Sequence, residues 1–107
     1  MDRIELFKKA LATWHRFTAD KPDFAPWVAG DIEFLLSLEM GRTAAGAPHL
    51  DDPQQERLEG IGMQKGQMGP LGGLAVRGIP DRELGNLLCE VQAEANKLRR
   101  ELGAQRR

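Results

Sequence analysis

The strongest constraint on the fold is a regular stripe of apolar residues in the last quarter of the chain. Successive members of the stripe are four, three, four, three and four residues apart. This alternation places them on one face of an α-helix, at the a and d positions of a heptad repeat. The pattern predicts a helix over residues 80–102, opened by Pro80 and ended by Gly103. The members of the stripe are Leu84, Leu88, Val91, Ala95, Leu98 and Leu102.

Such a stripe has two possible partners. In a parallel two-stranded coiled coil, Glu94 would face Arg99 of a second copy and Glu101 would face Arg106, so both pairs would join opposite charges. The stripe would then be the seam of a homodimer. Alternatively, it packs against the first helix within one chain, as most amphipathic helices do. We expect a homodimer, through this seam or through another pairing of helices.

The N-terminal segment has a second helical pattern. Asp2 and Glu5 have the spacing of a capping box, and apolar residues then recur at steps of three and four. Since Lys21 precedes a proline and is disfavoured in a helix, we predict a helix over residues 2–20. Its apolar face consists of Ile4, Phe7, Leu11 and Trp14.

The middle of the chain contains two shorter helical candidates. Residues 31–40 alternate between apolar and polar as a strand would, but their Leu, Glu and Met content, with Asp31 as cap and Gly41 as stop, favours a helix. Asp52 as cap, followed by Pro53, predicts another helix over residues 53–59.

The stretch GIGMQKGQMGPLGG, residues 60–73, has six glycines in fourteen positions. It lacks the spacing of a dinucleotide-binding fingerprint, and Lys65 precedes Gly66 instead of following it as in a phosphate-binding loop. We interpret it as a flexible contact loop in which Met63 and Met68 offer adaptable apolar contacts. The next segment, LAVRGI, is expected to be a short extended piece.

These elements predict an all-α fold in one domain, residues 1–107. Three or four helices would pack together, with the glycine-rich loop preceding the long C-terminal helix. A chain that is 41% hydrophobic and 29% charged suits a folded domain of this size. It is charged from its second residue, unlike a signal peptide, and has no apolar run near the ~18 residues of a membrane span. We therefore expect a cytoplasmic protein that makes no contact with membranes.

The residue types needed for catalysis are scarce. Histidine occurs only at positions 15 and 49 and cysteine only at position 89, and no metal-binding or nucleophile motif surrounds them. We expect no cofactor, no metal and no independent enzymatic activity. A weaker alternative is an enzyme whose site forms at a dimer interface around His49, Asp51 and Asp52.

Binding to another macromolecule is therefore the favoured function. Phe24 lies between Pro22 and Pro26, and Trp27 directly follows Pro26. These two aromatic residues could anchor a protein partner, although a connector that tucks them under the core is the favoured interpretation. With Met63 and Met68 they form the predicted partner-binding set of a regulator or accessory subunit. The main alternative is a nucleic-acid-binding regulator that uses the basic C-terminal residues. These residues are Lys97, Arg99, Arg100, Arg106 and Arg107.

Overall fold

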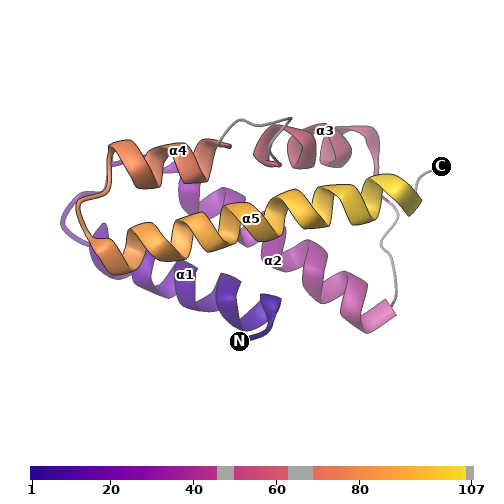
Figure 1. Ribbon diagram of the computed structural model, residues 1–107, viewed down its shortest axis with the longest axis horizontal. Coiled ribbons are helices and arrows are strands. Elements are labelled where there is room, and N and C mark those ends of the chain that lie inside the picture. Colours follow the sequence, from indigo (N-terminus) through magenta and orange to yellow (C-terminus); the bar gives the residue numbers. More distant parts are fainter. Residues whose placement is uncertain (46–49, 63–68, 106–107) are drawn as a thin grey trace.

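The computed structural model describes residues 1–45, 50–62 and 69–105, and the regular secondary structure in this part of the chain is α-helical. Five helices follow one another within it, and it contains no strand. The prediction of a small all-α domain is confirmed. The helices are α1 (Arg3–Phe17), α2 (Trp27–Ala45), α3 (Asp52–Ile61), α4 (Pro70–Arg77) and α5 (Arg82–Gln105) (Figure 1).

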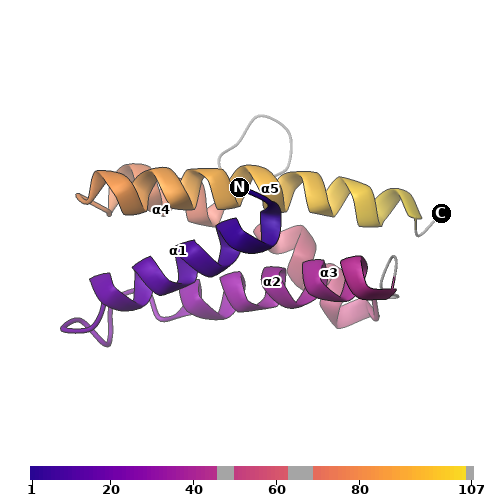
Figure 2. The same cartoon turned by 90° about the horizontal axis from the view of Figure 1, so that it is seen from below.

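The long α5 is the central element of the fold. It packs against α1, α3 and α4, while α1 also packs against α2. Seen from the side, α5 and α4 form one layer, and α1 and α2 form the other (Figure 2). The space between the layers is filled by aromatic and aliphatic side chains, the largest of which are Trp14 and Phe7 from α1 and Ile32 and Leu35 from α2.

All six residues of the predicted heptad stripe are buried in this single chain. Each has 3% or less of its surface exposed, and each belongs to the one hydrophobic core. The stripe thus follows the second of the two arrangements considered above, and it covers the inner faces of the chain's own helices. The charged residues beside it also bond within the chain: Glu94 and Glu101 both pair with Arg3. They do not need a second copy to meet a cation.

The N-terminus of α1 is capped as predicted, but the helix ends earlier than residue 20. Asp2 accepts a hydrogen bond at 2.8 Å from the backbone N–H of Glu5. At the other end, the backbone N–H of Thr18 bonds to Trp14 and its side chain bonds to the same carbonyl. These bonds close the last turn three residues before Lys21.

Residues 31–40 are helical, as favoured, but α2 is about twice as long as predicted. It starts at Trp27, directly after Pro26, because proline has the backbone angle of a first helical turn. Asp31 is therefore inside the helix, where it pairs with Arg57 of α3 at 3.5 Å, and it is not a cap. Gly41 does not stop the helix, since one glycine costs only about 1 kcal/mol there.

The cap of α3 is one residue earlier than predicted. Asp51 and Gln54 form the reciprocal capping box, with bonds of 2.8 and 3.1 Å, in place of Asp52 and Gln55. This register turns Gln55 into the protein interior. The helix then continues through Ile61 into the predicted loop.

Two predictions for residues 60–79 are wrong. Residues 60 and 61 belong to α3, and residues 70–77, expected to be a loop and an extended piece, form α4. Pro70 occupies the first turn of α4, and Gly78 follows its last residue. Met63 and Met68 are outside the described residues.

The start of the last helix also differs from the prediction. Asp81 accepts a hydrogen bond at 2.9 Å from the backbone N–H of Leu84, so α5 begins at Arg82 and Pro80 precedes it. The helix extends to Gln105, past Gly103.

Candidate functional site

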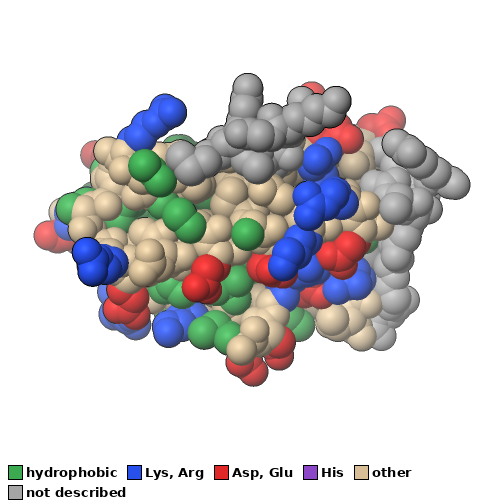
Figure 3. Space-filling view, in the orientation of Figure 1, with side chains coloured by type: hydrophobic (Ala, Val, Ile, Leu, Met, Phe, Trp, Pro, Cys, Tyr) green, Lys and Arg blue, Asp and Glu red, His purple; other side chains and the backbone are tan. Residues whose placement is uncertain are grey.

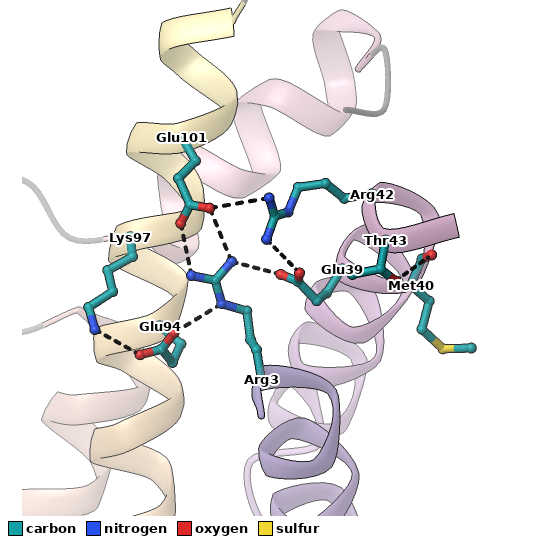
Figure 4. Close-up of polar contacts among 8 residues, drawn as sticks. All are labelled: Arg3, Glu39, Met40, Arg42, Thr43, Glu94, Lys97 and Glu101. Carbon is teal, nitrogen blue, oxygen red and sulfur yellow. Dashed lines mark hydrogen bonds and ion pairs between the residues drawn. The ribbon is translucent and has the colours of Figure 1, made fainter. Parts of the chain in front are cut away.

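A cluster of five charged side chains joins α1, α2 and α5 (Figure 4). The Arg3 guanidinium donates to Glu39 at 2.7 Å, and it also donates to Glu94 at 2.9 Å and to Glu101 at 2.8 Å. Arg42 donates to the second oxygen of Glu39 at 2.8 Å and lies 3.5 Å from Glu101. We call these five residues the Arg3 cluster.

The electrostatics of the Arg3 cluster indicate a structural role. Burial disfavours the charged form of Arg3, but its hydrogen bonds to the three carboxylates outweigh this and raise its pKa. Burial also disfavours the charged form of Glu94, which for a carboxylate raises the pKa. Hydrogen bonds from Lys97 and Arg3 outweigh this effect and lower the pKa of Glu94. The hydrogen bond from Arg3 also lowers the pKa of Glu101. These three groups stay charged near neutral pH, which makes them poor acid–base catalysts and good cross-links between helices.

A buried glutamine fixes the position of α4. Gln92 of α5 is 4% exposed, and its side-chain oxygen accepts bonds from the backbone N–H groups of Leu71 at 2.9 Å and Gly72 at 3.3 Å. Its amide nitrogen donates to the carbonyl of Ile61 at 2.7 Å and to Asn96 at 3.0 Å. One side chain therefore holds the end of α3 and the start of α4 against α5.

The connection between α1 and α2 separates the two aromatic residues predicted to bind a partner. Phe24 is half-buried, and its ring lies 5.9 Å from that of Trp14 and 6.0 Å from that of Phe17. Ala25 has the positive φ of 39°, which is unfavourable for a residue with a side chain. Trp27 follows at the start of α2 and is 43% exposed, whereas Trp14 is 2% exposed. Phe24 is therefore part of the core packing, and Trp27 is at the surface.

Trp27 lines an open groove of about 720 Å³ between the start of α2 and α4. The groove is within the size range of ligand sites in proteins. Its lining includes the apolar side chains of Trp27 and of two residues of α4, Pro70 and Leu74. We call it the Trp27 groove. Its lining residues are Trp27, Gly69, Pro70, Gly73, Leu74, Arg77 and Gly78.

Gly69 and Gly73 shape the groove in different ways. A side chain on Gly69 would overlap the amide of Gln92, so this glycine allows α4 to approach α5. A Cβ on Gly73 would meet no heavy atom within 4 Å. Internal packing therefore does not require glycine at position 73, and the missing side chain leaves open space in the groove.

Three basic residues of the nucleic-acid alternative, Lys97, Arg99 and Arg100, are in the described part of α5. Lys97 pairs with Glu94 at 3.0 Å, and Arg99 lies against Gly62, while Arg100 is exposed. Positions 106 and 107 are outside the described residues. Both acidic and basic side chains are present on the surface over the C-terminal half of α5 (Figure 3). A surface that carries both signs offers less attraction to phosphates than one that carries cations alone.

The residues considered for catalysis include two at the start of α3 and one on α5. Asp51 caps α3 and Asp52 begins it, His49 is outside the described residues, and Cys89 is exposed on α5. Within the described ranges, no three His, Cys, Asp or Glu side chains are grouped to hold a metal ion. No helix of the described chain combines the length and apolar character needed to cross a membrane.

Comparisons with protein-family models, with curated proteins and with solved structures find no match to this chain. The Trp27 groove is therefore interpreted from its own geometry. Sequence reasoning selected Trp27 but missed Pro70, Leu74 and Arg77, because their segment was interpreted as loop and extended chain. Pro70 at a first helical turn, with Leu74 and Arg77 at steps of four and three, was the available signal.

Proposed function

We propose that this protein acts as a regulator or accessory subunit by binding another protein, and that the Trp27 groove is its contact surface. The observation that carries the proposal is an exposed tryptophan beside an open, partly apolar groove. Tryptophan is among the residues that contribute most binding energy when an interface covers them. Homodimerisation through the α5 stripe is not part of the proposal, because that stripe is already buried within one chain.

The way the groove is held also supports a binding role. α4, which supplies most of its lining, is fixed by the Gln92 hydrogen bonds, and α2 is fixed through Glu39 to the Arg3 cluster. A surface that is already rigid before binding loses less conformational entropy when a partner binds to it. The fold thus presents the Trp27 groove from two anchored helices.

Affinity capture from the native host tests this function. The bait is the full chain, compared with Trp27→Ala and with Met40→Ala as a matched control. Met40 is also on α2, is 47% exposed and does not line the groove. We expect proteins retained by the wild type and by Met40→Ala to be absent with Trp27→Ala.

Far-ultraviolet circular dichroism should be the same for all three proteins, because both changes are at exposed side chains. If the three baits retain the same proteins in the same amounts, the groove is not the contact surface.

A further inference from the structure

We infer that the partner of the Trp27 groove is a peptide segment that presents a carboxylate beside apolar side chains. This inference rests on the proposed function and adds the chemistry of the partner. It follows from the one charged side chain among the described lining residues, the cation Arg77.

Arg77 is the charged residue of the groove lining, and no acidic residue is among the described residues that line the groove. Arg77 is exposed and, within the described chain, makes no ion pair, unlike Arg3, Arg42 and Arg57. It lies one turn of α4 beyond Gly73 and next to the apolar Leu74. A partner whose carboxylate approaches Arg77 can therefore place an apolar side chain against Leu74 and Trp27.

The start of α2 adds to the same preference. Trp27 is its first residue, and no acidic residue lies in its first turn. The positive end of the helix dipole therefore has no acidic side chain in the first turn of α2. Arg77 and the α2 terminus both favour a negatively charged partner. Since the described chain has no strand edge, recognition there depends on side chains and not on strand addition.

A library of random 16-residue peptides displayed on phage tests the inference with the full chain as bait. Peptides that bind the wild type are then tested on Gly73→Leu, which extends a side chain into the groove, and those that no longer bind are set apart. Gly60→Leu is the matched control, because a Cβ there also meets nothing within 4 Å but Gly60 does not line the groove. Trp27→Ala gives a second test of which peptides need the groove, because it removes a lining side chain and does not fill the groove.

We expect the peptides lost on Gly73→Leu and Trp27→Ala to be enriched in Asp or Glu beside Leu, Phe or Trp. For synthetic copies of these peptides, Arg77→Glu should weaken binding about tenfold, the effect of replacing one attraction by a repulsion. Arg82→Glu, an exposed arginine outside the groove, should change the Kd less than about twofold. Raising the salt concentration should weaken binding to the wild type more than to Arg77→Glu.

The two ways of failing are distinguishable. Groove-dependent peptides without acidic residues, or an unchanged Kd with Arg77→Glu, would overturn the carboxylate inference and leave the groove as a binding site. If no retained peptide is sensitive to Gly73→Leu or Trp27→Ala, both the inference and the proposed function are wrong.

Discussion

Replacing Arg3 by methionine should be among the most destabilising single changes at the charged surface of this protein. Methionine keeps much of the apolar stem and removes the guanidinium, which bonds to carboxylates on two other helices. The most sensitive of these is Glu39, whose side chain is 3% exposed. In the variant, Arg42 is the one remaining cation that bonds to Glu39 within the described chain.

The size of the loss follows from burial. Removing one partner of a buried ion pair costs about 3–5 kcal/mol, and the bond from Arg42 keeps this case near the lower limit. Glu94 and Glu101 are 24% and 36% exposed, so each adds less than about 1 kcal/mol. We expect a total near 3 kcal/mol. With an unfolding entropy of ~0.22 kcal/mol/K for a chain of this length, the melting temperature should fall by about 13 °C.

Urea unfolding followed by circular dichroism at pH 7 measures this free energy. Lys9→Met is the control, because Lys9 is exposed on the same helix and should change stability by less than about 0.5 kcal/mol. The double variant Arg3→Met with Glu39→Gln should recover at least half of the loss, since it removes the buried unpaired charge. If Arg3→Met costs under 1 kcal/mol, or if Glu39→Gln gives no recovery, the assignment of a buried structural charge cluster is refuted.

Four further changes test other parts of the structure. Because the pKa values of Glu94 and Glu101 are lowered in the folded protein, these two carboxylates stabilise it above their ordinary pKa of about 4.3, and this stability is lost as the pH falls through the lowered values. The urea midpoint should therefore drop between pH 5 and pH 3, and it should drop less steeply in Arg3→Met. Gln92→Ala should cost about 2–4 kcal/mol in urea unfolding by leaving buried backbone groups unpaired, and faster amide exchange in α4 would locate the effect. Gly69→Ala should cost about 1–3 kcal/mol alone but under about 0.5 kcal/mol in the Gln92→Ala background, where the overlap is relieved; equal costs in both backgrounds would contradict this packing. Ala25→Gly should raise the unfolding free energy by about 0.5 kcal/mol, whereas a loss would show that the positive φ is not strained.

Local patterns in the sequence predicted the parts of the fold that depend on neighbouring residues. The stripe from Leu84 to Leu102 shows its helical period directly, and Asp2 caps the first helix through a residue three positions away. The start of α2 was missed because Asp31, a residue type common at helix N-caps, was interpreted as the cap. Pro26, which directly precedes the helix, was not interpreted as a sign of its start. α4 was missed because its glycines and proline are individually poor helix formers, and it is held in place by Gln92.

Contacts between distant residues could not be predicted in the same way. The heptad spacing fitted a partner helix in a second copy as well as in the same chain, and the choice depended on how α1, α3 and α4 surround α5. Arg3 gave no signal in the sequence, since its three carboxylates are 36, 91 and 98 residues away. Trp27 was selected from its residue type alone, and its groove appeared only when α4 was in place.

The position of α5 has a consequence for synthesis on the ribosome. The three helices that pack against it all precede it in the chain, so their apolar faces remain uncovered until it emerges. Translation of its 24 residues takes about 1–5 s at ordinary rates. During that interval the nascent chain exposes apolar surface that will become its core, and such surface is prone to aggregation until α5 covers it.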